Sequence, residues 1–275
     1  MTGQGTNSYV IRGPQGVVVI DPGPELEAHF AALVTAIGTA RVAAILVTHA
    51  HLDHSALAPR LARHTGAPLL ASGRASEGRS AIMTRLAQAG LTSGGEGIDT
   101  HFAPDRNLID GEMLELAGLR IETIATPGHM AGHLSFGLGA DLFSGDHVMG
   151  WSSSLVSPPD GDMGDYVKSL QKLGKRPWQR FFPGHGAEIS SPATRLAELI
   201  EHRRSREAEI LAALAEAPAT AATLAALIYT STHSSLLPAA SRNVLAHLID
   251  LHDRKEILPL DPISTEARFK LFLQK

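Results

Sequence analysis

The chain has 275 residues, of which 44% are hydrophobic, enough to bury one large core or a large and a small one. Its net charge of −4 gives no global electrostatic preference for nucleic acids or membranes. Cysteine is absent, which excludes disulfides and thiolate ligands, so any metal must bind through nitrogen and oxygen. The polar N-terminus does not resemble a signal peptide, and no apolar run reaches the roughly 18–20 residues of a membrane span. We therefore expect a cytoplasmic protein.

Strands and helices alternate through the first two-thirds of the chain. The first predicted elements are a hairpin of strands at 9–12 and 17–20, a helix at 25–37 and an apolar strand at 43–48. Ser55 is expected to cap a helix that runs to about Thr65. Further strands are predicted at 114–126 around a turn at Gly118, at 134–138, at 142–143 and at 179–182. Before these strands, the glycine- and serine-rich residues 93–97 are expected to form a mobile loop.

The pattern changes at about Pro192. Three helical segments are predicted at 192–216, 220–229 and 238–253, followed by short apolar strands at 257–260 and 268–273. Three helices and a terminal hairpin are typical of a winged helix. The sequence therefore predicts two domains, a catalytic domain at 1–191 and a helical, winged-helix-like domain at 192–275.

Four side chains that can bind metal fall within the segment Thr48-His49-Ala50-His51-Leu52-Asp53-His54. Because this segment leaves a predicted buried strand, His49 and His51 can converge from one side while Asp53 and His54 turn toward a second point. A chance cluster of surface histidines is the alternative, but the order H-x-H-x-D-H in this setting argues against it. A zincin site is excluded, since that site needs H-E-x-x-H on a helix.

Three later segments supply further candidate ligands, each after a glycine at the end of a strand. They are Pro127-Gly128-His129, Gly145-Asp146 and Gly184-His185-Gly186. Glycine permits a sharp backbone turn, so the following side chain can point inward. Four ligands are too few to complete two metal sites, and these residues are expected to supply the rest.

Taken in order, the four segments resemble the motifs of the metallo-β-lactamase superfamily over about residues 1–190. The resemblance implies an α/β (α+β) fold, a four-layer αβ/βα sandwich of two mixed sheets with helices outside. It also implies a dinuclear metal centre. The implied ligands are His49, His51 and His129 for the first metal, Asp53, His54 and His185 for the second, and Asp146 as the bridge between them.

Neutral imidazoles and carboxylates suit zinc, so we predict two Zn²⁺ ions, with Mn²⁺ or Fe²⁺ as alternatives. Two such metals about 3.5–4 Å apart can share a hydroxide that attacks an ester-type bond. The resemblance makes Asp53 a candidate catalytic proton acceptor. It places His133 near the site but outside the ligand set, in a catalytic, supporting or packing role. Asp21 is expected either to accept a hydrogen bond from a ligand imidazole or to form a turn.

The superfamily includes hydrolases of β-lactams, thioesters, lactones and phosphodiesters, so its fold does not fix a substrate. Asp146 is generally missing from true β-lactamases, and neither a glutathione-binding tail nor a β-CASP insertion is evident. The segments Gly5-Thr6-Asn7-Ser8-Tyr9 and 148–162, together with the C-terminal pattern, resemble the beta-lactamase-like protein 2 branch, which includes a single-strand-specific endoribonuclease. Relatives carry several residues before the first of these segments, so we expect a late start site or a missing part of a substrate wall.

Two substrate classes remain: a small ester, thioester or lactone, and single-stranded RNA. Basic residues that could contact RNA are Lys168, Lys172, Lys175, Arg176, Arg180, Arg203, Arg204 and Arg206. Interleaved glutamates favour a solvated helix face over RNA contact, and Trp151 and Trp178 are candidates for base stacking or for packing. His51 disfavours a flavodiiron-like oxidoreductase, which carries glutamate there. The complete ligand set disfavours a non-catalytic winged-helix regulator.

Overall fold

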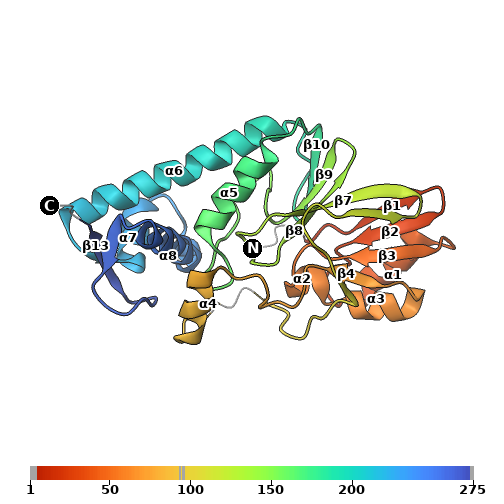
Figure 1. Cartoon of the computed structure of the whole chain (residues 1–275), viewed down its shortest axis with the longest axis horizontal. Helices are drawn as coiled ribbons and strands as arrows, with labels where there is room; N and C mark the ends of the chain where they lie inside the picture. The colour runs from red at the N-terminus through yellow and green to blue at the C-terminus, as the bar shows by residue number, and fades with distance from the viewer. Residues whose placement is uncertain (1–4, 93, 95–96, 273–275) are drawn as a thin grey trace.

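The computed structural model describes residues 5–92, 94 and 97–272, and two five-stranded sheets form its larger part (Figure 1). The first sheet has the order β1-β2-β3-β4-β5, antiparallel between β1 and β2 and parallel elsewhere. Its strands are β1 (Tyr9–Gly13), β2 (Gly16–Ile20), β3 (Val42–Leu46), β4 (Leu69–Ala71) and β5 (Arg106–Asn107).

The second sheet has the order β10-β9-β8-β7-β6 and is antiparallel except between β9 and β10. Its strands are β6 (Met113–Leu116), β7 (Leu119–Ala125), β8 (Leu134–Leu138), β9 (Asp141–Gly145) and β10 (Arg180–Pro183). The helices associated with the two sheets are α1 (Glu27–Ile37), α2 (Leu52–Ser55), α3 (Ala58–Thr65), α4 (Ala81–Gln88) and α5 (Met163–Leu173).

Alternation along β2 shows how the layers are built, because successive side chains of a strand point to opposite faces. Val17 and Val19 pack with residues of α1 and α3 in the outer cluster of the first sheet. Val18 and Ile20 pack with residues of the second sheet, including Phe136, in the cluster between the sheets.

The outer face of the second sheet is covered in turn by α5. The order is therefore helices, sheet, sheet, helices, which confirms the predicted four-layer sandwich.

The C-terminal part begins with the long helix α6 (Pro192–Glu216), which extends from the sandwich to the last elements of the chain (Figure 1). Those elements are β11 (Ala219–Thr220), α7 (Ala221–Ile228), the 3₁₀ helix η1 (Ser234–Leu236), α8 (Leu237–Asp253), β12 (Ile257–Pro259) and β13 (Arg268–Leu271). The strands form a small antiparallel sheet in the order β11-β13-β12. This arrangement confirms the expected winged helix.

The long helix α6 belongs to two hydrophobic clusters. Leu196 and Leu199 in its first half pack with α5 and the second sheet, whereas Ile210 and Leu214 pack with α7 and α8. The helix begins at Pro192, where the second domain is predicted to start. The division at 191/192 stays a prediction, because α6 connects the two cores physically.

One local prediction is wrong. Ser55 does not cap a helix reaching Thr65: it is the last residue of α2, and α3 begins at Ala58 with Leu57 at its N-cap. The Ser55 hydroxyl instead lies within hydrogen-bond distance of two acceptors, the His51 carbonyl at 3.0 Å and Asp99 Oδ2 at 2.8 Å. Residues 93, 95 and 96 of the predicted mobile loop lie outside the described residues. Over the described part of the chain, no helix is both long and apolar enough to cross a membrane.

Candidate metal centre

The candidate ligands come together at one edge of the sandwich, on the loops that follow strands. The loop after β3 carries His49 and His51, and the short helix α2 carries Asp53 and His54. The remaining three ligand candidates follow β7, β9 and β10, and they are His129, Asp146 and His185. Their side chains, apart from the half-buried Asp53, are buried. The structure thus brings all seven predicted ligands into a single cluster.

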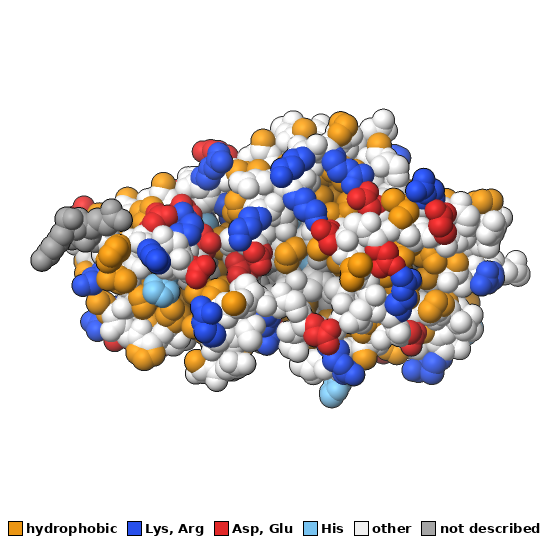
Figure 2. All heavy atoms as spheres, viewed as in Figure 1, with side chains coloured by type: hydrophobic (Ala, Val, Ile, Leu, Met, Phe, Trp, Pro, Cys, Tyr) orange, Lys and Arg blue, Asp and Glu red, His pale blue; other side chains and the backbone are white. Residues whose placement is uncertain are grey.

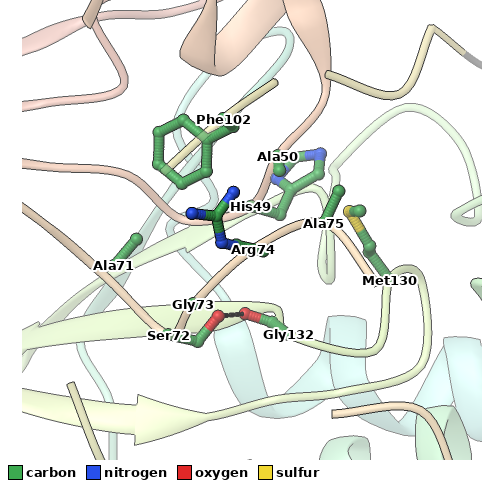
Figure 3. Close-up of a pocket in the computed structure, with 10 residues that line it drawn as sticks. All are labelled: His49, Ala50, Ala71, Ser72, Gly73, Arg74, Ala75, Phe102, Met130 and Gly132. Atoms are coloured by element: carbon green, nitrogen blue, oxygen red, sulfur yellow. Dashed lines mark hydrogen bonds between the residues drawn. The ribbon is translucent and has the colours of Figure 1, made fainter. Parts of the chain in front are cut away.

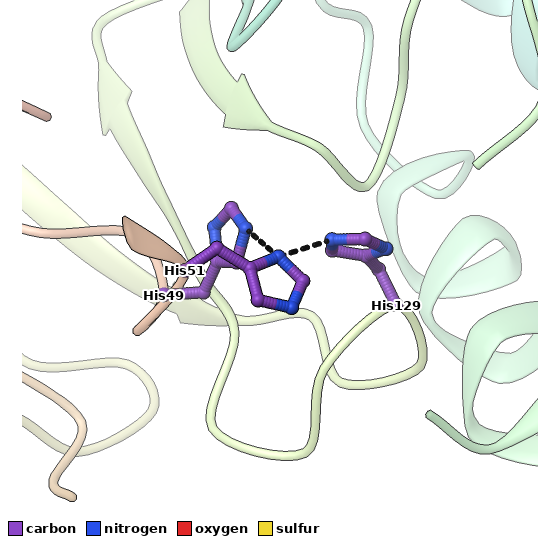
Figure 4. Close-up of side chains that lie close together, drawn as sticks. All are labelled: His49, His51 and His129. Carbon is purple, nitrogen blue, oxygen red and sulfur yellow. Dashed lines mark hydrogen bonds between the residues drawn. The ribbon is translucent and has the colours of Figure 1, made fainter. Parts of the chain in front are cut away.

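Three imidazoles form the first group (Figure 4). His51 Nδ1 lies 2.9 Å from His49 Nε2 and 3.1 Å from His129 Nε2. Nitrogens bound to one tetrahedral zinc at about 2.0–2.1 Å would be roughly 3.3 Å apart. These three ring nitrogens therefore have a spacing close to that of atoms sharing one metal ion.

Asp53, His54 and His185 form the second group. Asp53 Oδ2 lies 3.2 Å from His185 Nε2 and 3.5 Å from His54 Nε2. Asp146 adjoins both groups, since its carboxylate lies 3.3 Å from His185 Nε2, 3.5 Å from His54 Nε2 and 3.8 Å from His129 Nε2. This position between the groups is where a bridging ligand must be.

Two buried atoms in the cluster test whether a metal fits. His54 Nε2 and Asp146 Oδ1 are inaccessible to solvent and lie 3.5 Å apart, and neither forms a well-oriented hydrogen bond with any of the described residues. A buried polar atom without a partner is costly unless an ion or water satisfies it. Both atoms have lone pairs that can coordinate a divalent metal, so the residues present fit a metal centre.

Burial sets the protonation of the first group. It lowers the pKa of His49 well below its ordinary value and the pKa of His51 to about 3, and positive charge on neighbouring imidazoles adds to both shifts. Both rings are therefore neutral near pH 7. A neutral imidazole has the lone pair that a metal requires, so these two residues need not lose a proton to bind.

The carboxylates determine the protonation of the imidazoles in the second group. Burial lowers the pKa of His185, but hydrogen bonds with Asp146 and Asp53 outweigh burial and raise this pKa to about 10. The pKa of His54 is likewise raised well above its ordinary value by Asp146 and Asp21, against the effect of burial. Without a metal, these imidazolium charges balance the carboxylates, and a metal ion would take their place.

Asp21 holds the His49 and His54 rings in position. Its Oδ2 accepts hydrogen bonds from His54 Nδ1 at 2.9 Å and from the Thr48 hydroxyl at 2.8 Å. That hydroxyl in turn accepts from His49 Nδ1 at 2.9 Å. The expected hydrogen bond between Asp21 and a ligand imidazole is present. Together, the hydrogen bonds to His54 Nδ1 and His49 Nδ1 leave the Nε2 atoms of both rings directed at the cluster.

Replacing Asp21 with asparagine is expected to weaken zinc binding about 10- to 100-fold, because the oriented carboxylate that fixes two rings is lost. Asparagine tolerates the left-handed backbone of this residue (φ 49°), so the fold should be retained. The measurement is competition for zinc with a chromophoric chelator. Asp165→Asn, at a surface carboxylate of α5, is the control, and equal affinity in both variants would contradict this role for Asp21.

His133 lies behind Asp146 and not beside open space. It is 1% exposed, its Nε2 accepts a hydrogen bond from the Asp146 backbone N–H at 3.2 Å, and its Nδ1 donates to Thr126 at 2.9 Å. Both ring nitrogens are thus occupied, and the ring lies 5.0 Å from that of His49. This geometry favours a positioning role over the predicted catalytic one, which stays untested.

Two backbone contacts of the ligands are missed by sequence reasoning. The carbonyl of Leu155 accepts a hydrogen bond from His129 Nδ1 at 2.6 Å, and that of Gly5 accepts from His185 Nδ1 at 2.9 Å. Both bonds direct Nε2 toward the cluster. No sequence signal could have identified them, because every residue type carries a carbonyl.

A small cavity of about 10 Å³ adjoins His49 on the side of β4 (Figure 3). Phe102, Met130 and the exposed Arg74 are among its lining residues, and the Ser72 hydroxyl closes one side by donating to the Gly132 carbonyl. A space of this size holds about one water molecule. It is therefore too small to be a substrate pocket.

Models of two known protein families match the two parts of this chain. The model of the metallo-beta-lactamase superfamily matches residues 1–185, and that of the beta-lactamase associated winged helix domain matches residues 220–257. The chain belongs to the metallo-beta-lactamase superfamily. The match includes all seven ligand candidates, so the predicted resemblance is confirmed.

Two curated relatives in the superfamily show the range of named functions. A beta-lactamase-like protein 2 homolog of Drosophila melanogaster is 29% identical over 264 residues, covering 91% of this chain and 83% of the relative. An atrochrysone carboxyl ACP thioesterase of Aspergillus chevalieri is also 29% identical, over 218 residues. This second match covers 78% of the chain but only 61% of the thioesterase.

Solved structures of the superfamily agree with the architecture. A metallo-beta-lactamase family protein from Thermus thermophilus superposes with a TM-score of 0.77 at 25% identity, covering 97% of this chain and 94% of that one. A second protein, solved in a di-iron-bound form, is 30% identical with a TM-score of 0.52 and covers 68% of this chain and 91% of its own. The metallo-beta-lactamase fold and the C-terminal winged helix are thus both shared with known proteins.

Proposed function

We propose that this chain is a dinuclear metallohydrolase of small ester-type substrates, with a thioester as the first candidate. The observation that carries the proposal is Asp146, whose carboxylate lies within 3.8 Å of imidazoles from both ligand groups. The first metal would be held by His49, His51 and His129, the second by Asp53, His54 and His185, with Asp146 bridging. Zinc is the proposed ion, since it prefers tetrahedral sites of imidazole and carboxylate.

Two divalent ions held there would supply Lewis-acid activation of water and of the scissile carbonyl. The protein residues would hold the two ions in fixed positions. Asp53 is the ligand best placed to exchange a proton, because it is the one half-exposed member of the set. Its Oδ2 accepts a hydrogen bond from Thr6 at 3.0 Å, and its pKa is held below the ordinary value mainly by hydrogen bonding with His185 in opposition to burial.

The choice of substrate is supported by the names of relatives and by charge. One relative is named as an acyl-carrier-protein thioesterase, although the chain spans only 61% of its length. For RNA, the basic run on and after α5 is largely neutralised, because its members pair with carboxylates. The pairs are Lys168–Asp165, Lys172–Asp110, Arg176–Glu122 and Arg180–Asp141.

Other residues considered for RNA contact are also unsuited to it. Arg203 is 1% exposed and Trp178 is 8% exposed, so neither can reach a nucleic acid from its present position. The prediction that Arg203 lies on a solvated or RNA-binding helix face is wrong. On the face seen in Figure 2, basic side chains are most numerous in the upper middle, and acidic side chains lie beside them. Phosphodiester cleavage therefore stays the second candidate.

Trp151 is the clearest candidate for substrate contact. Its side chain is 54% exposed and packs closely against Gly186, the neighbour of His185. Arg195 holds the surrounding loop by donating to the carbonyls of Met149 at 2.8 Å and Ser152 at 2.9 Å. An exposed indole fixed beside the metal ligands offers an apolar surface for an acyl chain.

Trp151→Ala is expected to raise KM for a medium-chain acyl thioester about tenfold with little change in kcat, because apolar burial of the substrate is lost. Trp151→Phe keeps an aromatic surface and should restore most of the affinity. Steady-state kinetics at equal metal content checks the prediction. An unchanged KM in the alanine variant would exclude Trp151 from the substrate-binding surface.

The substrate proposal is tested by assaying one metal-loaded preparation against a small acyl thioester and a single-stranded RNA oligonucleotide. Thioester turnover that is lost with His49→Ala and with a chelator is the expected result. RNA cleavage with the same two dependences, without thioester turnover, would favour the second candidate instead. A contaminating nuclease would be recognised, because its RNA cleavage would persist in the His49→Ala preparation.

A further inference from the structure

The segment 154–158 lies directly behind the metal centre and contacts two proposed ligands. The Leu155 carbonyl fixes the His129 ring through the 2.6 Å hydrogen bond to its Nδ1. The Ser154 hydroxyl donates to the backbone carbonyl of Asp146. A shift of this segment would therefore move an imidazole of the first group and the backbone of the bridging carboxylate together.

Side chains of the C-terminal helices hold the same segment from its other side. They are Arg203 on α6 and Arg242 and Asn243 on α8. Their contacts are Arg203 Nη2 to the Ser154 carbonyl, Val156 N–H to Asn243 Oδ1 at 2.9 Å, Arg242 Nε to the Ser157 hydroxyl at 2.9 Å and the Arg242 guanidinium to the Pro158 carbonyl. Each residue from 154 to 158 except Leu155 is thus hydrogen-bonded to a side chain of the C-terminal part. Leu155 is instead hydrogen-bonded to the proposed metal ligand His129.

Arg203 is buried where it contacts this segment. Arg203 is 1% exposed, and its guanidinium lies 5.0 Å from the centre of the Tyr166 ring and contacts Asn243 Oδ1 at 3.5 Å. No carboxylate of the described residues forms an ion pair with it, and its Nε has no hydrogen-bond partner there. Burying a guanidinium without a counter-charge is unfavourable, so its contacts with the Ser154 carbonyl, Asn243 and the Tyr166 ring must offset part of this cost.

We propose that Arg203 and Asn243 are positioning residues of the metal centre, through which the C-terminal domain holds His129 and Asp146 in ligand geometry. The winged helix is then part of the construction of the site as well as a neighbouring domain. The inference rests on the proposed ligation by His129 and Asp146. It predicts that metal affinity depends on residues of α6 and α8 that are too deeply placed to touch substrate.

The test uses the full chain with zinc or cobalt as the probe. Asn243→Ala and Arg203→Met should weaken zinc binding about 10- to 100-fold, as loss of groups that orient ligands does. Both should also alter the visible absorption of the cobalt-loaded protein, which reports ligand geometry. Asn243→Asp keeps an oxygen that accepts from Val156 N–H and should restore the zinc affinity.

Arg206→Met is the matched control. Arg206 lies one turn further along α6, pairs with Glu209 and packs over the Tyr229 ring, away from the segment. It should lower the melting temperature of the metal-free protein without changing zinc affinity or the cobalt spectrum. If the role of Arg203 were only structural, Arg203→Met would likewise lower the melting temperature without changing zinc affinity or the cobalt spectrum.

Unchanged zinc affinity and cobalt spectrum in Asn243→Ala and Arg203→Met would overturn the positioning role, as would an equal loss in Arg206→Met. If Arg203→Met does not fold, the comparison of Asn243→Ala with Asn243→Asp decides. A wild-type chain that binds neither ion would contradict the proposed function itself. Normal wild-type binding with unaffected variants would contradict only the positioning role.

Discussion

Asp146→Asn is expected to reduce hydrolysis by on the order of 10³-fold or more, because both ligand groups lose the carboxylate between them. Asparagine has nearly the same shape, so the fold should survive, but its amide is a weaker, neutral donor that cannot bridge two cations. Metal content should fall from two ions per chain to one or fewer. Elemental analysis, with circular dichroism as the check on folding, measures this outcome.

The matched control is Asp141→Asn, at the start of strand β9, whose other end is followed directly by Asp146. Asp141 pairs with Arg180 at 2.7 Å on the surface, where an ion pair contributes little. This control should keep two metals and full turnover. Retention of two metals and normal activity in Asp146→Asn would remove the basis for a bridged centre.

Gly184→Ala is expected to disrupt the site almost as severely, although it changes no ligand. A Cβ at this residue would lie 2.3 Å from Asp146 Oδ1 and 2.7 Å from His54 Cε1, closer than real contacts allow. Both ligands must move to make room, so we expect metal affinity and turnover to fall at least about 100-fold. Zinc titration and steady-state kinetics check this.

Gly150→Ala is the control for Gly184→Ala. Its new Cβ would meet its nearest neighbour, a side-chain atom of Ile189, at 3.4 Å, an ordinary contact. It should bind zinc normally. A Gly184→Ala protein with normal zinc affinity would show that the ligand cluster can rearrange freely, contrary to the tightly packed site described above.

Short-range patterns predicted the fold and the site composition well. The apolar run after residue 42 and the H-x-H-x-D-H segment lie next to each other in sequence, so the strand and its metal-competent loop could be recognised together. The spacing of helices after Pro192 likewise indicated the winged helix. At Gly184, however, the expected reason was a sharp turn, whereas the structure shows that glycine is required because Asp146 and His54 leave no space for a Cβ.

Long-range packing was beyond the sequence. Arg203 has glutamates nearby in the chain and looked like a surface residue, yet α6 packs that face against the segment behind the metal centre. Trp178 was open to stacking or packing, and its 8% exposure favours packing. Ser55 looked like a helix cap, but its hydroxyl bonds to Asp99, 44 residues away. Each of these outcomes depends on a partner that no local pattern identifies.

The most direct test of the dinuclear centre is the metal content of the chain, measured by elemental analysis while thioester turnover is followed during stepwise removal and return of zinc. We predict two ions per chain, loss of turnover as the ions leave, and recovery when zinc is restored. Full activity at zero metal, or a capacity for no more than one ion in the wild-type chain, would contradict the account.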